Sequence, residues 1–424
     1  MAHPTSGLDR IDHVVVIMLE NRSFDHMLGF LYSEEGNVSP LGHPFEGLTG
    51  NETNEDKDGN VIKVWRLDPS DPYCYFTPRA DPGEGFANTS AQLWDDNMVV
   101  EQKKPPDNSG FVKNYQYTMG WEPGAGFDIY PGASAKGILA MHTPETLPVM
   151  SALARGYAVC DHWYCSAPTE TQPNRAFMHM ATSEGLIHND WKYPFRSKSI
   201  CGALGDNGQS WAIYAYDTAQ MSYTRFDIAD LLAAPDSNFG TFDDFKTAAA
   251  SGKLANYSFL EPKWGTTGNS MHPNYNVASG EQYLKEIYET VRSSPCWEKT
   301  LLVVTFDEHG GCYDHVAPPT GAVPPDGTKA PNGFAFDRFG VRVPTILVSP
   351  WIEAGTVHRA PGRTPFDHTS ILRTVGVRWG FAPLTRRDAA APDVGGVFTL
   401  DAARTDDVLA SVAPPTASLP TDKK

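Results

Sequence analysis

Short runs of apolar residues recur along the chain, and polar turns bound each of them. The clearest are residues 13–19 (HVVVIML), 157–165 (YAVCDHWYC), 300–306 (TLLVVTF) and 343–351 (VPTILVSPW), with a weaker run at 255–262 (ANYSFLEP). Because these runs do not alternate between apolar and polar residues, they predict strands of a parallel sheet that is covered on both faces.

Amphipathic patterns between these runs predict helices. Residues 143–157 (TPETLPVMSALARGY) precede the second predicted strand, and residues 279–295 (SGEQYLKEIYETVRSSP) precede the third. The latter segment opens with Ser279 and has Gln282 three residues later, which is the signature of a capping box. Strands that alternate with helices predict an α/β fold, a three-layer α/β/α sandwich around a mostly parallel central sheet. In such sheets ligands bind beyond the carboxyl ends of the strands.

Two segments lack this pattern. Residues 34–135 are rich in Gly, Pro, Asn and Asp and carry many aromatic residues. They predict long decorating loops with short strands or helices, an insertion that forms a lid or wall over an edge of the sheet. Residues 403–424 form a tail whose last ten residues or so are expected to be disordered. Without an internal repeat or a clear linker, residues 1–402 are expected to form a single domain.

Composition and charge narrow the class of protein. The chain has 424 residues, of which 41% are hydrophobic, enough for a large core. Its 34 basic and 51 acidic residues give a formal net charge of −17, which argues against nucleic acid as a partner and against a basic membrane-surface protein. An acidic enzyme can still act on anions if a metal or a local basic group supplies the attraction.

The N-terminus and the cysteines bear on the compartment. The first residues show no signal pattern, and their apolar run is too short to span a bilayer. We expect a soluble chain, either cytoplasmic or secreted or periplasmic with its leader removed. The six cysteines are sparse and form no CxxC pair, so they are expected to be mainly buried thiols, with one or two disulfides as the alternative.

Polar residues of the kinds that bind metals and phosphates follow three of the predicted strands directly. Residues 20–26 (ENRSFDH) follow the first strand, residues 166–175 (SAPTETQPNR) the second, and residues 307–311 (DEHGG) the third. Since the carboxyl ends of parallel strands meet at one edge of a sheet, the three clusters are expected to converge on one site.

Two of these clusters offer oxygen ligands, which are Glu20, Asn21, Asp307 and Glu308. Carboxylates and an amide carbonyl suit a hard divalent cation such as Ca²⁺, Mg²⁺ or Mn²⁺, although Zn²⁺ also accepts carboxylates. The sequence therefore predicts a divalent metal of open identity. Gly310 would let the chain turn sharply after the acids.

The remaining cluster holds three hydroxyl groups, those of Ser166, Thr169 and Thr171. Coordination of a threonine alkoxide by a metal would make it a usable nucleophile. Pro173 fits a fixed turn into a helix whose first amides would face a phosphate. The alternative is that the cluster is only a polar helix cap.

Four histidines are candidates to protonate a leaving oxygen: His272, His309, His315 and His368. His272 is the best of them, because it lies in a loop of Gly, Asn and Pro just before the helix that leads to Asp307. His368 is equally suited to capping the helix that follows it.

Taken together, these stretches resemble the phosphoesterase family that contains bacterial and plant non-specific phospholipases C and bacterial acid phosphatases, within the alkaline-phosphatase-like superfamily. The resemblance runs in family order from residue 11 to about residue 382. It is carried by residues 13–30, 169–175, 256–262, 272–319, 342–351 and 366–373. Such long ordered matches are far more specific than any single short motif.

The resemblance implies an α/β/α sandwich, one metal ion and a phosphorylated Ser or Thr intermediate. By position it implies Thr171 as the nucleophile, with Glu20, Asn21, Asp307 and Glu308 as metal or phosphate ligands. His272 falls on an HP motif and would contact phosphate oxygens or act as the acid. We also expect substrate contacts from Asn174, Arg175, His309, His315 and Glu84.

The sequence departs from the family at Glu84, in the stretch DPGEGF of residues 81–86, where the family often has a histidine. A carboxylate there should repel a doubly charged monoester more than a singly charged diester. The change therefore favours a diesterase, although a changed substrate or reduced activity would also fit.

The expected function is hydrolysis of phosphatidylcholine-type phosphodiesters by a phospholipase C, through a phosphothreonine intermediate and with transient membrane contact. The alternatives are an acid phosphatase that acts on monoesters and a catalytically weak phosphate-binding protein. A sulfatase is disfavoured because the chain has no CxPxR motif. Aromatic residues between positions 65 and 121 could cage a quaternary ammonium group, but they suit core packing better.

Overall fold

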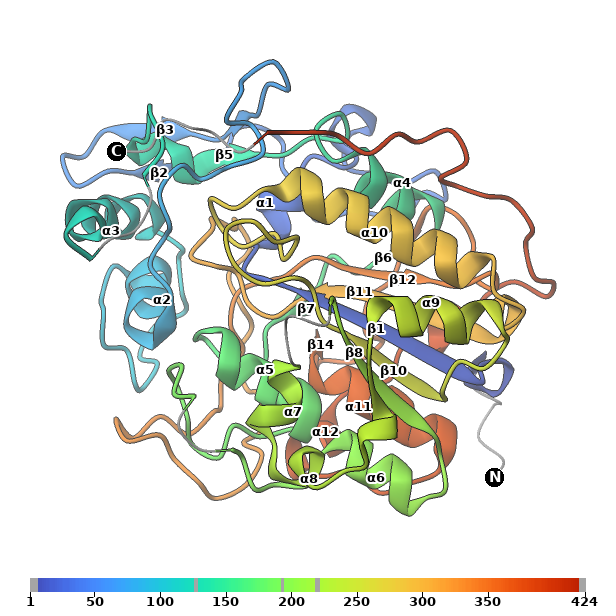
Figure 1. Ribbon diagram of the computed structural model, residues 1–424. Coiled ribbons are helices and arrows are strands. Elements are labelled where there is room, and N and C mark those ends of the chain that lie inside the picture. The colour runs from blue at the N-terminus through green and yellow to red at the C-terminus, as the bar shows by residue number, and fades with distance from the viewer. Residues whose placement is uncertain (1–6, 126–128, 192–193, 218–221, 419–424) are drawn as a thin grey trace.

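The structure, a computed structural model, describes residues 7–125, 129–191, 194–217 and 222–418. Its centre is an eight-stranded sheet in the order β13-β6-β12-β11-β1-β10-β8-β9 (Figure 1). The strands are β1 (His13–Leu19), β6 (Ala158–Val159), β8 (Trp211–Ala215), β9 (Phe239–Thr241), β10 (Tyr257–Leu260), β11 (Thr300–Phe306), β12 (Thr345–Val348) and β13 (Thr356–Val357).

The two central strands, β1 and β11, match the predicted runs residue for residue. All seven residues of β11 are buried, as are six of the seven in β1, because helices cover both faces of the sheet. β1 pairs in parallel with both β10 and β11, and the pairs β10–β8, β8–β9 and β13–β6 are also parallel. The mostly parallel α/β sheet is thus confirmed.

β12 runs antiparallel to both of its neighbours, β11 and β6, although the run at 343–351 was predicted to be a parallel strand. A parallel return needs a crossover, usually through a helix. The connection over residues 307–344 contains no helix, so the chain re-enters the sheet at the edge where β11 ends, with Thr345 opposite Thr305. An uninterrupted apolar run shows burial on both faces and carries no information on strand direction.

The predicted strand at 157–165 is two short strands, β6 and β7 (Trp163–Tyr164), and β7 pairs with β14 (Phe366–Asp367) outside the main sheet. The break contains Asp161, which is fully buried. Its carboxylate accepts hydrogen bonds from Arg359 Nε at 2.8 Å and from the backbone amide of Glu46 at 2.7 Å. Because these groups bind the buried Asp161 carboxylate, the chain leaves the main sheet between β6 and β7.

Helices form a layer on each face of the sheet, which gives the predicted sandwich (Figure 1). One layer contains α4 (Pro148–Gly156), α9 (Phe242–Ala250) and α10 (Val277–Arg292), and the other contains α5 (Thr171–Met180), α6 (Ile200–Asp206) and α11 (Thr369–Trp379). The shorter helices are α1 (Phe24–Leu28), α7 (Tyr223–Asp227), α8 (Ala229–Leu232) and α12 (Arg386–Ala390).

α10 starts two residues before the predicted position. Its N-cap is Asn276, whose side chain accepts a hydrogen bond from the amide of Ala278 at 3.1 Å. The capping box predicted at Ser279 is therefore wrong. An Asn cap satisfies a free amide as well as a Ser cap does, and the helix takes the earlier of the two.

The segment 34–135 lies beside the sheet rather than within it (Figure 1). It contains β2 (Thr53–Glu55), β3 (Val61–Lys63), β4 (Trp65–Arg66), α2 (Gly85–Trp94) and α3 (Phe111–Ala125), and β4 pairs with β5 (Ala140–Met141). Leu93, Phe111 and Tyr115 belong to a hydrophobic cluster separate from the main core. A local core makes this segment more structured than loops alone, and its role as a lid stays a prediction.

The described part of the C-terminal tail follows α10. Lys285 Nζ donates to the carbonyl of Val412 at 2.6 Å, and Gln282 Nε2 donates to that of Pro415 at 3.0 Å. Residues 419–424, which include most of the predicted disordered end, lie outside the described residues. The six cysteines are all buried and unbridged, which confirms the thiol prediction. Within the described ranges, no helix has the length and apolar character needed to cross a bilayer.

Candidate active site

Three acidic residues leave the carboxyl edge of the sheet on adjacent strands. β1 and β11 pair in parallel, with Leu19 opposite Phe306. Glu20 and Asp307 are therefore the first residues beyond two neighbouring strands. β10 lies on the other side of β1 and ends just before Glu261. The register of a parallel sheet thus brings together residues far apart in the chain, as predicted for the first two.

Asn21 connects this edge to three other segments. Its backbone has φ of 61°, a left-handed conformation that Asn adopts more readily than most residues. The amide donates to Asp307 Oδ1 at 3.0 Å, and the side-chain Nδ2 donates to Glu84 Oε1 at 2.5 Å. The side-chain Oδ1 accepts a hydrogen bond from Thr171 Oγ1 at 3.3 Å. The strained turn at Asn21 therefore brings together a predicted metal ligand, the predicted nucleophile and Glu84.

Thr171 is the first residue of α5 and is 6% exposed. The two rival hydroxyl groups have other partners: Ser166 Oγ donates to Asp367 Oδ2 at 3.1 Å, and Thr169 Oγ1 donates to the carbonyl of Ile187 at 2.5 Å. Of the three hydroxyl groups, that of Thr171 is the one directed at Asn21. This arrangement favours Thr171 as the nucleophile.

The side chain of Asn174 folds the loop that precedes α5. Its Oδ1 accepts from the amide of Ala167 at 2.9 Å, and its Nδ2 donates to the carbonyl of Thr169 at 2.9 Å. Both ends of the side-chain amide are thus used inside the protein, and the predicted contact of Asn174 with substrate stays a prediction. The amide of Gln172 donates to Asn189 Oδ1 at 2.8 Å, and Pro173 has no N–H. Neither Gln172 nor Pro173 therefore offers a free N–H to a phosphate, in contrast to the prediction for the first amides of this helix.

Arg175 lies one helical turn after Thr171 and forms an ion pair with Asp307, with Nε 2.8 Å from Oδ2. Its Nη2 donates to the carbonyl of Leu19 at 3.2 Å, and the guanidinium lies 4.7 Å from the centre of the Trp264 ring. Its Nη1 is buried and has no hydrogen-bond partner among the described residues. A guanidinium with one free donor beside the predicted nucleophile suits an anionic ligand.

The predicted metal ligands form a buried acidic group. Burial raises the pKa of Glu20, Asp307 and Glu308, and the nearby carboxylates of Glu84 and Asp307 raise that of Glu308 further. Glu308 Oε2 accepts from the amide of Gly310 at 2.7 Å, while its Oε1 is buried without a partner among the described residues. Buried carboxylates that repel one another, one with an unpaired oxygen, have the chemistry of a divalent cation site.

The predicted ligands do not, however, form the tightest clusters of this kind. In the described part of the chain, the groups of three side chains whose ligand atoms lie within 4.8 Å of one another are Asp81–Glu84–His272 and Asp25–Asp314–His315. The donor types of Glu20, Asn21, Asp307 and Glu308 fit a metal, and their joint coordination of one ion stays a prediction.

His272 pairs with the residue at which the sequence departs from the family. Its Nε2 lies 3.3 Å from Glu84 Oε1, and its Nδ1 lies 3.7 Å from Asp81 Oδ1. Burial alone would lower the pKa of His272, but the two carboxylates raise it well above the usual value. Burial would likewise raise the pKa of Glu84, but His272 and the Asn21 amide lower it. The structure therefore favours a protonated His272 paired with an ionised Glu84.

The other three candidate histidines differ in their surroundings. His309 Nε2 contacts Gln92 Oε1 at 2.7 Å, and burial lowers its pKa to about 3, so it is neutral. His368 is the N-cap residue of α11, but its side chain makes no capping hydrogen bond and its Nε2 instead contacts the backbone carbonyl of Asp307 at 2.6 Å. His315 Nδ1 instead contacts Asp25 Oδ2 at 2.6 Å, within a separate ion-pair network. His309 and His368 thus adjoin the acidic group, and His315 is not brought to it.

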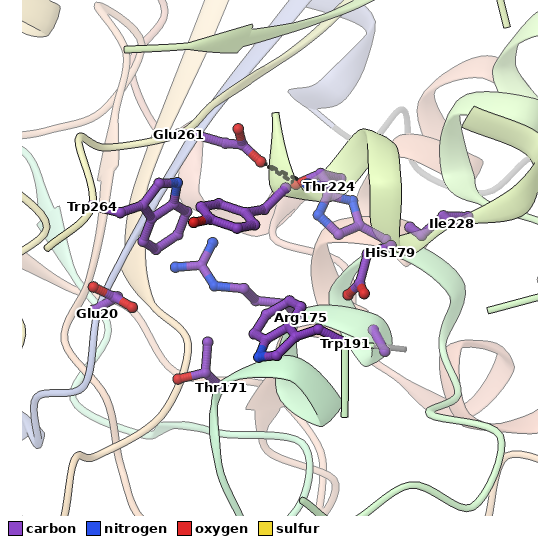
Figure 2. A pocket seen from close by; sticks show the side chains of 12 residues that line it. Glu20, Thr171, Arg175, His179, Trp191, Thr224, Ile228, Glu261 and Trp264 are labelled. Carbon is purple, nitrogen blue, oxygen red and sulfur yellow. Dashed lines mark hydrogen bonds between the residues drawn. The ribbon is translucent and has the colours of Figure 1, made fainter. Parts of the chain in front are cut away.

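A cavity of about 300 Å³ opens beside Thr171 and Arg175 (Figure 2). Its aromatic lining residues are Trp191, Tyr223 and Trp264. These lie outside the segment 65–121, where the sequence suggested an aromatic cage. Glu261 also lines the cavity and was missed, although it follows the apolar run of β10 as directly as Glu20 follows that of β1. The same rule applied to the weaker fifth run would have found it.

The chain is similar in sequence to known proteins over most of its length. Residues 11–382 match the Phosphoesterase family. The chain is 39% identical to Non-specific phospholipase C1 of Arabidopsis thaliana, over 90% of this chain and 69% of that protein. It is 27% identical to Phospholipase C B of Mycobacterium tuberculosis, over 95% of this chain and 80% of that protein.

Among solved structures, the lipoteichoic acid synthase LtaP from Listeria monocytogenes has a TM-score of 0.40 and 13% identity, over 60% of this chain and 70% of that chain. The two structures are thus only distantly alike. The family match extends over nearly the whole described chain and includes every segment that contributes to the acidic edge. The chain therefore belongs to the Phosphoesterase family and is a phosphoric ester hydrolase.

Proposed function

We propose that this chain is a metal-dependent phospholipase C that hydrolyses phosphatidylcholine-type phosphodiesters through a phosphothreonine intermediate. The hydrogen bond from Thr171 Oγ1 to Asn21 Oδ1, at 3.3 Å, is the observation that supports this most, because it holds the nucleophile at the acidic edge of the sheet. The relatives from Arabidopsis thaliana and Mycobacterium tuberculosis are phospholipases C, which supports the phospholipase C assignment. Transient contact with a membrane follows from a lipid substrate.

Thr171, His272 and Arg175 would each have a separate role in the reaction. Thr171 Oγ gives its proton to solvent and attacks phosphorus, the bond between phosphorus and the glycerol oxygen breaks, and protonated His272 gives its proton to the departing diacylglycerol oxygen. Water then attacks the phosphothreonine and gives a proton to His272, the bond between phosphorus and Thr171 Oγ breaks, and Thr171 Oγ takes up a proton from solvent as the phosphorylated head group leaves. Arg175 Nη1, which has no partner among the described residues, would bind a phosphate oxygen.

Glu20, Asn21, Asp307 and Glu308 would hold one divalent ion. When bound, the ion would supply positive charge that stabilises the alkoxide and the transition state. The pairing of Glu84 with His272 also bears on the substrate. Because His272 offsets the charge of Glu84, the site stays suited to a singly charged diester, while a doubly charged monoester still meets additional carboxylates.

Substitution of Thr171 tests the proposal. Thr171→Val keeps the shape and removes the hydroxyl, so hydrolysis of a chromogenic phosphocholine diester should fall at least about 1,000-fold. Thr171→Ser keeps a nucleophile and should retain measurable turnover. Thr169→Val is the matched control and should change turnover little, because Thr169 Oγ1 contacts the carbonyl of Ile187 instead.

A chemical trap tests the intermediate directly. Acid quenching during turnover, followed by mass spectrometry, should find a phosphoryl group on Thr171. A fully active Thr171→Val variant would refute the nucleophile. Hydrolysis of a monoester together with no hydrolysis of the diester would favour an acid phosphatase over a phospholipase C.

A further inference from the structure

Buried polar atoms without partners line the part of the cavity beyond Thr171. Glu261 is 1% exposed, and its Oε1 accepts hydrogen bonds from the amide and the hydroxyl of Thr224, at 2.8 and 2.6 Å. Its Oε2 has no partner among the described residues. His179 is 2% exposed, and neither of its ring nitrogens has one. Together with Arg175 Nη1, three buried side chains thus present unpaired atoms in a single cavity.

Such a concentration is costly unless a ligand uses these atoms. A buried polar group without a hydrogen bond destabilises a protein, and native interiors contain few of them. The unpaired groups are also of opposite kinds. The Arg175 guanidinium is complementary to an anion, and the Glu261 carboxylate is complementary to a cation. A ligand that satisfies both carries a negative and a positive group.

The charges of the lining residues point the same way. Glu20, Asp227 and Glu261 all line the cavity. Among the described lining residues, the basic ones are Arg175 and the buried His179. Arg175 already forms an ion pair with Asp307. The cavity therefore has more carboxylates than basic side chains, and Glu261 lies at the side away from Thr171 (Figure 2).

Aromatic rings complete the wall of the cavity. The rings of Trp191 and Tyr223 are 5.9 Å apart, and those of Tyr223 and Trp264 are 5.4 Å apart. Trp191 is 52% exposed and Tyr223 is 47% exposed, so the cavity can be entered from solvent on this side. Faces of Trp and Tyr attract ammonium groups. Arg175 already covers one face of Trp264, which leaves Trp191 and Tyr223 for a ligand.

We propose that this cavity binds the ammonium end of a zwitterionic phospholipid head group, with Glu261 as the charged contact and Trp191 and Tyr223 as aromatic walls. The inference rests on the proposed function, because the head group reaches the cavity when its phosphate lies at Thr171. Primary and quaternary ammonium groups share the positive charge that the cavity lacks. A primary ammonium would in addition donate hydrogen bonds to Glu261 Oε2 and His179.

Calorimetric titration of the full chain tests the inference without requiring turnover. Phosphoethanolamine and phosphocholine should bind at least about tenfold more tightly than glycerol 1-phosphate, which has a phosphate and no ammonium group. Glu261→Gln should reduce this preference at least about fivefold, since the charge is lost and the acceptor for Thr224 is kept. Glu286→Gln, on the exposed side of α10, is the matched control and should keep the preference.

A second variant covers the case in which Glu261→Gln does not fold. Tyr223 is half-exposed, so Tyr223→Ala should fold and should weaken both ammonium ligands relative to glycerol 1-phosphate. Equal binding of all three ligands to the unmodified chain would overturn the inference, as would a preference that survives both variants. The tighter of the two ammonium ligands then identifies the head group.

The two proposals fail in distinguishable ways. A chain that hydrolyses a phosphodiester through Thr171 but binds the three ligands equally would refute the head-group cavity alone. A chain that prefers the ammonium ligands but gives no phosphothreonine would refute the proposed reaction and leave the cavity assignment standing.

Discussion

The close approach of the loops after β1 and β11 can be tested at Gly310. Its φ is 60°, and a Cβ at this position would stand 2.0 Å from the backbone oxygen of Asn21. Real Cβ atoms essentially never come within 3.0 Å of such an atom. Gly310→Ala must therefore move the two loops apart until the distance from Cβ to the Asn21 oxygen reaches at least 3.0 Å. The left-handed conformation costs about 1 kcal/mol for a residue with a Cβ, and the overlap adds roughly 1–3 kcal/mol.

Gly310→Ala should therefore lower the free energy of unfolding by about 2–4 kcal/mol. It should also displace Asn21 from Asp307 and Thr171, and an error of this size in a catalytic site can cost on the order of 100-fold in rate. Urea denaturation and hydrolysis of a chromogenic phosphocholine diester measure the two effects.

Gly321 provides the matched control for this experiment. Its φ is 83°, and a Cβ there would meet no atom within 4 Å. Gly321→Ala therefore has the cost of the left-handed conformation without the overlap. Its free energy of unfolding should fall by about 1 kcal/mol, and its diester hydrolysis should be unchanged. If Gly310→Ala were no less stable than Gly321→Ala and equally active, the reasoning that the two loops touch at Asn21 would be refuted.

Three further predictions concern charge and metal. Arg342 is fully buried and pairs with Asp25 and Asp314 at 2.8 and 3.0 Å, so Arg342→Met should cost on the order of 3–5 kcal/mol in urea denaturation. Arg225→Met, whose ion-pair partner is largely exposed, should cost under about 1 kcal/mol. Burial raises the pKa of Glu281 from 4.5 to about 8, so the folded state keeps a proton that the unfolded state has lost, and the free energy of unfolding should fall as pH rises from 4.5 to 8. Urea denaturation at pH 5 and pH 8.5 should show this decrease, and Glu281→Gln should flatten it. Removal of divalent ions with a chelator should abolish diester hydrolysis, and re-addition should restore it; unchanged turnover in metal-free protein would contradict the metal site.

The strands that carry the site could be predicted from the sequence. The runs at 13–19 and 300–306 contain no polar residue other than His13, Thr300 and Thr305, and such runs are stable only when both faces of the strand are covered. Polar residues that follow these runs must lie at the sheet edge, so Glu20 and Asp307 were predicted from local sequence alone. Family motifs in the correct order then favoured Thr171 over two adjacent hydroxyl groups as the proposed nucleophile.

Strand direction and the wall of the cavity depend on how the distant parts of the chain pack together. The apolar run of β12 indicates burial but not direction, and the strand runs antiparallel because its connection contains no crossover helix. His315 follows the same strand as Asp307, yet it contacts Asp25 instead of the acidic edge.

Glu261 directly follows β10 and could have been placed at the sheet edge, but the sequence contains no signal that Trp191 and Tyr223 would meet it. Local patterns report which residues are buried and where an element ends, because burial and capping are local requirements. Which distant side chains share a cavity depends on how strands are ordered and how loops cross the sheet edge. That is why the predicted catalytic groups came from the sequence, and the residues proposed to select the head group came from the fold.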